Sequence, residues 1–284
     1  MLQHVKSPMP KRPAINTSPL QRKLKRVTSV PRGSMPIVFS SGAALRPLKT
    51  SESVARNIIH DIVENDLPSG TSLPSEAVML KKYAVSRESL REGLRLLEVQ
   101  GLISLRRGPG GGPIVGTVDP ANLGRISTLY YHLVGATYAE LIDAWAIAEG
   151  MLAELAARNA DRDRVRAGMA PYIVEQPHLH DESKADFVQS HSDFHFVMGA
   201  LADNRVLQLS LSAIGEIITH HVILNADPRD ARIIIETDHR AIAKAVAAGH
   251  ALKARELTQQ HMYSVSDFYK GEIGPKMDDF VEWR

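Results

Sequence analysis

Patterns typical of β-strands occupy only two short runs of this 284-residue sequence, and that confinement limits its possible folds more than any other feature. The runs cover residues 102–105 and 113–115, and the Arg- and Gly-rich residues 106–112 between them predict a β-hairpin turn. Apolar residues recur at helical spacing through much of the remaining sequence. We therefore predict a mainly α protein that contains one small hairpin.

Three short helices are expected before the hairpin. Apolar residues repeat at helical spacing over residues 51–65, Ser75 is placed to begin a second helix, and Ser86 is placed to cap a third. Gly101 ends the third helix. The order of three helices followed by a basic hairpin predicts a winged helix-turn-helix domain over residues 51–118.

Strand signals largely stop after Asp119 and Pro120. The helices predicted beyond this point cover residues 121–134, 137–160, 161–174, 182–202, 204–224, 228–249 and 251–270. Ala and Leu dominate them, which favours an antiparallel helix bundle over a sheet. We expect this helical domain to span residues 119–272 and a weakly ordered tail to follow at residues 273–284.

Charge is divided unevenly along the chain. Residues 1–50 contain ten Lys or Arg side chains and no Asp or Glu, which leaves a net charge of −8 in residues 51–284. Composition predicts a basic disordered tail at residues 1–50, which contacts phosphates nonspecifically, is simply solvated, or is in part an artefact of the start site or of expression. Any nucleic-acid surface on the acidic remainder must therefore be a local patch.

The composition also excludes several classes of protein. The sequence has no cysteine, so disulfide scaffolds and thiolate metal sites are excluded. Its apolar runs fall far short of the ~20 residues that a membrane span needs. The N-terminus lacks the apolar core of a signal peptide. We therefore expect a soluble cytoplasmic protein without a membrane partner.

The third predicted helix has the features of a DNA-recognition helix. Arg87, Arg91 and Arg95 recur at i, i+4 and i+8, on a different face from its leucines. The first turns of such a helix meet base edges in the major groove, where arginine can bind guanine through two hydrogen bonds. The alternative is a solvated arginine stripe. The candidate DNA contacts are Ser86, Arg87, Ser89, Arg91, Arg95, Arg106, Arg107 and Gly108.

Residues 67–107 resemble the DNA-binding domain of the GntR superfamily. The resemblance rests on Leu-Pro-Ser-Glu at residues 73–76, Val-Ser-Arg-Glu-Ser-Leu-Arg-Glu-Gly-Leu at 85–94 and Leu-Glu-Val-Gln-Gly-Leu-Ile at 97–103. It implies a transcriptional regulator that contacts double-stranded operator DNA mainly through Arg87 and Arg91. Many members carry Arg where this chain has Ala77, so the operator is expected to differ.

The helical domain resembles the FCD type found in the FadR branch of that superfamily, an effector-binding and dimerisation domain. The matching marks are Glu149 with Ala156 and Ala157, Phe194-His195, Asp-His-Arg-Ala-Ile at 238–242, and His261. Such domains commonly hold a divalent metal through an Asp four residues before the Phe-His histidine, that histidine and two later histidines. The resemblance implies His195, His239 and His261 as ligands here.

The position where the family places Asp is occupied by His191. His191 and His195 are i, i+4, so both imidazoles lie on one face of a helix. Four neutral imidazoles suit a divalent transition metal such as zinc or nickel better than magnesium or calcium. The alternative is that the two histidines are ordinary surface or core residues that bind no metal.

The candidate effector contacts are Trp145, Arg125 and His220. Many relatives carry Arg where this chain has Trp145. The pocket therefore lacks a cation for an acidic effector at this position and offers an aromatic surface instead. A carboxylate remains a candidate effector, because a metal with open positions can bind one.

Two classes of function compete. The first is a ligand-responsive, DNA-binding transcriptional regulator that acts as a homodimer and is not an enzyme; the second is a metal-dependent hydrolase that uses the histidine cluster. The hydrolase lacks a recognisable motif for a general base or nucleophile and leaves residues 67–116 unexplained. A protein-interaction module with a degenerate DNA reader is a third alternative, for which Ala77 is the only indication.

Overall fold

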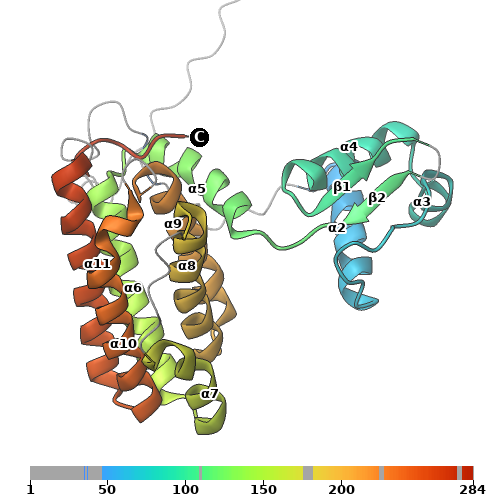
Figure 1. Cartoon of the computed structure of the whole chain (residues 1–284). Helices are drawn as coiled ribbons and strands as arrows, with labels where there is room; N and C mark the ends of the chain where they lie inside the picture. Colours follow the sequence, from blue (N-terminus) through green and yellow to red (C-terminus); the bar gives the residue numbers. More distant parts are fainter. Residues whose placement is uncertain are drawn as a thin grey trace, which may run out of the picture.

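The computed structural model describes residues 35, 37, 47–108, 111–174, 182–223, 227–273 and 277–283. Most of the predicted basic tail lies outside these residues. Figure 1 shows an α/β lobe joined to a larger helical lobe by an extended stretch before α5 (Pro120–Val134). No helix of the described part is long and apolar enough to cross a membrane.

The first lobe has the predicted winged helix-turn-helix order. It consists of α2 (Thr50–Glu64), α3 (Glu76–Tyr83), α4 (Arg87–Val99), β1 (Ile103–Arg106) and β2 (Gly112–Val115). The strands pair antiparallel with Ile103 opposite Val115, and both side chains are buried. They join Val54, Ile58, Leu73, Met79, Leu90, Leu94 and Leu97 in a small core.

Local sequence explains how α4 is placed. The Ser86 side chain accepts a hydrogen bond from the Ser89 backbone nitrogen at 3.2 Å, which caps the helix as predicted. Gly93 lets α2 cross closely, because a Cβ atom at this position would lie 2.9 Å from the Ser51 carbonyl oxygen. The buried leucine face and the close crossing hold α4 with its arginines outward.

The second lobe is the predicted helix bundle. After α5 it contains α6 (Tyr138–Arg158), α7 (Arg162–Ile173), α8 (Lys184–Leu201), α9 (Arg205–His221), the 3-10 turn η2 (Pro228–Ala231), α10 (Arg232–Ala248) and α11 (Ala251–Ile273). Helix starts are set by side chains that accept a backbone N–H: Asp119, Thr137, Asp161, Ser183 and Asn204. The chain is therefore mainly α, as the sequence predicted.

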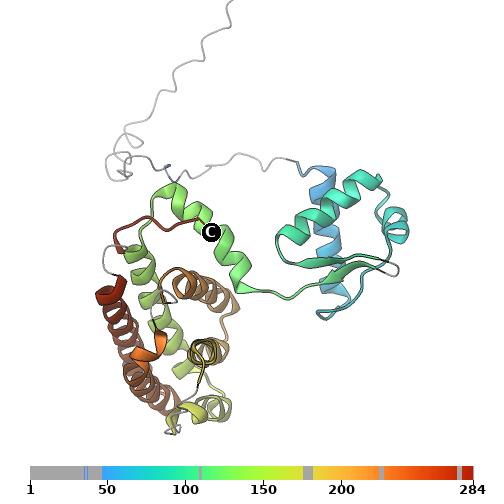
Figure 2. The same ribbon diagram turned by 45° about the horizontal axis from the view of Figure 1, so that its top comes forward.

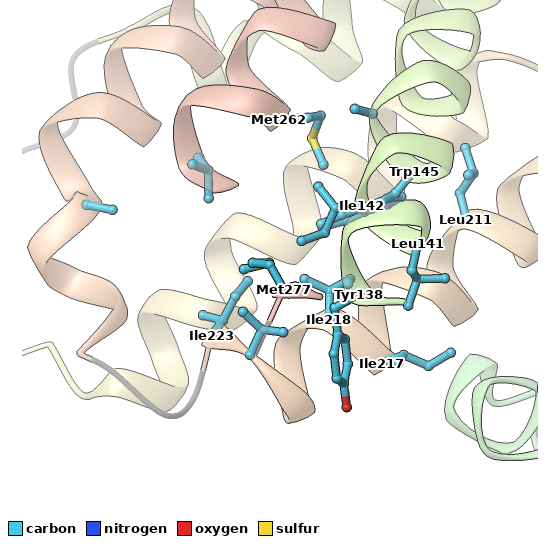
Figure 3. Packing of buried hydrophobic residues seen from close by; sticks show 14 of the residues in the cluster. Tyr138, Leu141, Ile142, Trp145, Leu211, Ile217, Ile218, Ile223, Met262 and Met277 are labelled. Atoms are coloured by element: carbon cyan, nitrogen blue, oxygen red, sulfur yellow. The ribbon is translucent and has the colours of Figure 1, made fainter. Parts of the chain in front are cut away.

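Helix α6 is central to the bundle, because α8, α9, α10 and α11 all pack against it. Its buried residues contribute to two apolar clusters. Figure 3 shows the first, where Tyr138, Ile142 and Trp145 lie among side chains from α9 and α11. The second includes Ala153 together with Phe194 of α8 and Ile242 of α10. Three helices that carry predicted metal ligands thus converge beside α6.

The expectation of a weakly ordered C-terminal tail is wrong for residues 277–283. Val281 is fully buried, and its backbone nitrogen donates to the Ala136 carbonyl oxygen at 2.8 Å. Phe280 forms an isolated antiparallel bridge with Thr137, and Met277 is buried. The segment folds back over the start of α6 and joins the core there.

Helix α5 connects the two lobes, as the turned view in Figure 2 shows. It packs against α9 on the bundle side. Towards the other lobe, the Arg125 guanidinium donates a hydrogen bond to the Val99 carbonyl oxygen, at the end of α4, over 2.7 Å. The last turn of the candidate recognition helix is thereby tied to the bundle.

Candidate functional site

The exposed face of α4 presents the arginines that the sequence selected. Arg87, Arg91 and Arg95 are all exposed, whereas Leu90 and Leu94 point into the core. The three arginines line one shallow surface hollow beside the start of α2. This is the outward stripe that a helix needs if it is to lie in a DNA groove.

The wing adds further cations to this surface. Arg106 and Arg107 are exposed at the end of β1, and Gly108 has a φ of +96°, a backbone conformation that glycine adopts readily. Arg91, Arg95 and Arg106 line a common groove between α4 and the hairpin. The fold thus gathers the predicted contacts of the helix and the wing on one side of the domain.

One arginine of α4 has an acidic neighbour. The Arg91 guanidinium lies 3.3 Å from a carboxylate oxygen of Glu76, and the Arg91 side chain is 69% exposed. An ion pair this exposed is worth well under about 1 kcal/mol, so a phosphate or a guanine can replace the carboxylate. Sequence reasoning missed this contact, because it joins two helices.

Four histidines from three helices form a cluster inside the bundle. His191 and His195 come from α8, His239 from α10 and His261 from α11. One ligand atom of each lies within 4.8 Å of the others, and the Nε2 atoms of His239 and His261 are 3.2 Å apart. The structure therefore brings together all four histidines that the sequence named.

Two carboxylates fix the orientation of two rings. Nδ1 of His195 lies 3.1 Å from Glu149, and Nδ1 of His261 lies 3.2 Å from Asp238. A carboxylate is a strong hydrogen-bond acceptor, so these contacts favour the tautomer in which Nδ1 carries the proton and Nε2 keeps its lone pair. Carboxylates of this kind orient histidine ligands in metal sites. The sequence analysis did not assign this role to either residue.

The cluster contains nitrogen atoms that lack a protein partner. Nδ1 of His191 and Nε2 of His195 are buried and make no hydrogen bond within the described part of the chain. Burial lowers the pKa of His191 and of His239 well below that of free imidazole, and it also lowers the pKa of His261. These rings are therefore neutral at pH 7, the form in which imidazole binds a metal.

The distances fit a transition metal as well. Zn–N bonds measure about 2.0–2.1 Å, so two nitrogens on one ion lie at most about 4.2 Å apart. The His239–His261 distance meets this limit, and the full set within 4.8 Å needs only small shifts of the rings. A metal would also give the buried nitrogens the partner that they lack.

A cavity of about 330 Å³ opens beside the cluster. His191 and His195 form part of its wall together with Trp145, which the sequence named as an effector contact. The indole ring centre lies 6.3 Å from that of His195. Pro120, the first residue of α5, also lines the cavity.

The other two predicted effector contacts do not line this cavity. Arg125 instead bonds to the carbonyl oxygen of Val99 in the first lobe, because it lies on the side of α5 that faces that lobe. His220 points to the surface and pairs with Glu216 at 3.3 Å, while its neighbour His221 is buried against Tyr138. Both predictions of cavity contacts are therefore corrected.

Two family models match the chain. The model described as bacterial regulatory proteins of the gntR family covers residues 50–111, and the FCD domain covers residues 140–264. The first corresponds to the lobe that carries α4 and the wing. The second includes all four histidines of the cluster.

Curated relatives match over both domains. The Uxu operon regulator of Haemophilus influenzae is 25% identical over 76% of this chain and 80% of its own length. The HTH-type transcriptional repressor NanR of Citrobacter rodentium is 25% identical over 81% of this chain and 90% of its own length. The Glc operon transcriptional activator of Escherichia coli K12 is 26% identical over 75% of this chain and 86% of its own length.

A solved structure shares the fold. Streptococcus agalactiae GntR aligns with a TM-score of 0.53 at 21% identity and covers 76% of this chain and 99% of its own. The family models and the relatives describe regulators of transcription rather than enzymes. The chain is therefore a DNA-binding transcriptional regulator of the gntR family whose second domain is an FCD domain.

Proposed function

We propose that this regulator binds its operator as a homodimer through α4 and the wing, and that a small molecule bound beside a metal in the FCD domain controls the binding. The observation that carries the proposal is the set of four clustered histidines next to a cavity, two of which, His191 and His195, have a buried nitrogen without a hydrogen-bond partner among the described residues. The metal is a divalent transition metal, with zinc or nickel as the best fit to four imidazoles.

The metal organises the domain rather than catalysing a reaction. Its ligands come from α8, α10 and α11, so binding ties three helices together and stabilises the folded state. The two nearby carboxylates, Glu149 and Asp238, already accept hydrogen bonds from the histidines. Both carboxylates therefore serve to orient the rings, and no observation on the residues that the structure describes favours the hydrolase alternative.

The route from the cavity to DNA runs through α5. A ligand in the cavity touches Pro120 at the start of α5, and Arg125 one turn later is bonded to Val99 at the end of α4. A shift of α5 on ligand binding moves the anchor of the recognition helix. This coupling is a two-state hypothesis that needs the ligand to bind the two arrangements with different affinity.

An exposed apolar stripe supports the homodimer. Ile147, Met151 and Leu155 recur at i, i+4 and i+8 on α6 and are 47%, 45% and 37% exposed. Apolar side chains that gather on one helix face mark interaction surfaces. A single reading helix rarely buries enough surface for specific binding, and a two-fold dimer on a pseudo-palindrome doubles it.

Elemental analysis of the full chain, purified without a metal-affinity column, tests the metal part of the proposal. We expect close to one equivalent of zinc or nickel per chain and a higher melting temperature on adding either ion to stripped protein. Less than about a tenth of an equivalent of any transition metal, with no thermal shift, removes the metal from the account.

A further inference from the structure

We propose that the 330 Å³ cavity selects a ligand with an acceptor oxygen group at one end and hydroxyl or ammonium donors at the other, and that it disfavours a second carboxylate. The inference rests on the proposed function, because it concerns the effector cavity beside the metal. It assigns the two ends of the ligand from the chemistry of the buried and of the more exposed side chains that line the cavity.

The buried part of the lining requires an acceptor. Trp145 is 8% exposed, and its Nε1, which can only donate, has no hydrogen-bond partner among the described residues. Trp145 lines the cavity, and α9 approaches its indole closely at Gly215, where a Cβ atom would lie 3.3 Å from the ring. A ligand oxygen at this end can accept from Nε1–H while a second oxygen faces the histidines.

The more exposed carboxylates of the lining, Asp193 and Glu216, offer acceptors instead. Asp193 accepts a hydrogen bond from Gln189 at 2.8 Å, and Glu216 lies 3.3 Å from Nε2 of His220. A carboxylate has about four acceptor sites, so both residues can accept further hydrogen bonds from a ligand. The other polar side chains that line the cavity, apart from the histidines, are Glu149, Gln189, Ser192, Gln208, Ser212 and Thr219.

No Lys or Arg lines this cavity among the residues that the structure describes. The nearby arginines lie elsewhere. Arg232 and Arg240 line a separate hollow of about 400 Å³ with His191 and His239, and Arg232 is paired with Glu182 at 2.6 Å. A dianion in the first cavity would place its second charge beside carboxylates with no cation to balance it.

The cavity size limits the ligand as well. A volume of about 330 Å³ lies at the lower end of the range for small-molecule sites and suits a compound of about six carbons. Trp145, Leu152 and Leu211 supply apolar surface for its carbon skeleton. Four acids of matched length therefore serve as probes: 6-aminohexanoate, gluconate, hexanoate and adipate.

The test is calorimetric titration of these probes into the zinc-loaded full chain. We expect 6-aminohexanoate and gluconate to bind about tenfold more tightly than hexanoate or adipate. Glu216→Gln should reduce the preference for 6-aminohexanoate over adipate about fivefold. Glu256→Gln, which removes an exposed carboxylate paired with Lys253 at 3.0 Å, should leave the ranking unchanged.

Three results would overturn the ligand class. They are tightest binding by adipate, binding of neither donor-bearing acid at millimolar concentration, and loss of binding in Arg240→Gln, which would place the ligand in the other hollow. The zinc content is measured before the titration, so that a failure of the proposed ligand class can be told apart from a failure of the proposed metal site. A chain that takes up no zinc overturns the metal, whereas a zinc-loaded chain that prefers adipate overturns only the ligand class.

Discussion

Arg91 is the side chain on which we propose that DNA reading most depends. It lies one turn after Arg87 on the outward face of α4, and its guanidinium lies 3.3 Å from the half-buried Glu76. Arg91→Ala should weaken binding to the operator by about 5- to 150-fold, which corresponds to about 1–3 kcal/mol. The measurement is a mobility shift with the specific site.

A matched variant separates this effect from the loss of any surface ion pair. Arg166→Ala removes an exposed arginine that is paired with Asp163 at 2.7 Å and lies in the other lobe. It should bind DNA as the unmodified chain does, with an unchanged melting temperature. An Arg91→Ala variant with full operator affinity would contradict the assignment.

The two later histidines carry the second residue-level prediction. His239→Ala and His261→Ala should each lose the metal, because their Nε2 atoms face each other at 3.2 Å in the buried cluster. Operator binding should remain and the response to ligand should disappear. Metal content by elemental analysis and DNA affinity by anisotropy are the two readouts.

The control for these variants is His60→Ala. His60 is exposed on α2 and pairs with Glu64 at 3.0 Å, far from the cluster in sequence. The His60→Ala variant should retain a full equivalent of metal. Metal that stays bound in both His239→Ala and His261→Ala would rule out the cluster as the site.

At the scale of elements, α2 and α3 are held together by one carboxylate. Asp61 of α2 accepts a hydrogen bond from the Tyr83 hydroxyl at 2.5 Å and lies 2.6 Å from the Lys82 ammonium. Burial raises the pKa of Asp61, but the bonds from Lys82 and Tyr83 outweigh it and the net pKa is lowered. Burial and the bond to Asp61 raise the pKa of Tyr83.

The sign of the pH dependence follows from these directions. A depressed carboxyl pKa stabilises the fold above the unfolded value of about 3.9, and the contribution is lost as pH falls through the folded value. The first lobe should therefore lose stability in acid below about pH 4. Thermal unfolding followed between neutral and acid pH measures this loss.

Tyr83→Phe tests the hydrogen bond between Tyr83 and Asp61. It should cost about 1 kcal/mol at neutral pH and make the acid loss smaller, because Asp61 then has one bond fewer to lose. Tyr130→Phe, at an exposed tyrosine of α5, should leave both unchanged. Equal melting temperatures for Tyr83→Phe and the unmodified chain would show that the short contact adds no stability.

The helices themselves could be predicted from sequence because local signals define them. Ser86 caps α4 and Asp119 caps α5 through bonds within three residues, and each is visible as a residue type at a helix start. The backbone hydrogen bond from Val281 to Ala136 joins residues more than a hundred positions apart, and no local sequence pattern predicts it. The tail was therefore misjudged.

The same distinction holds for the cluster. The four histidines could be chosen because one pair has helical spacing and the others match a family pattern. The pairings of His195 with Glu149 and of His261 with Asp238 depend on how α6, α8, α10 and α11 pack. Arg125 and His220 were misplaced for the same reason, since the rotation of a helix about its axis decides which face meets the cavity.

At the scale of the whole molecule, the apolar stripe of α6 predicts the dimer seam. Met151→Glu should convert the proposed homodimer to monomer and weaken operator binding, because it places a charge in the middle of the stripe. Val206→Glu, at an isolated exposed residue at the start of α9, should remain dimeric. Light scattering at micromolar concentration measures both, and a dimeric Met151→Glu would place the seam elsewhere.

The most direct test of the account is selective DNA binding by the metal-loaded chain, with and without metabolite extract. The chain is mixed with a pool of genomic fragments that includes its own upstream region, and retained fragments are measured by anisotropy against scrambled DNA. The account predicts a fragment with a pseudo-palindrome bound about a thousandfold or more tightly than scrambled DNA, with an affinity that the extract changes. Retention of no fragment above scrambled DNA, or an affinity that no extract alters, would contradict it.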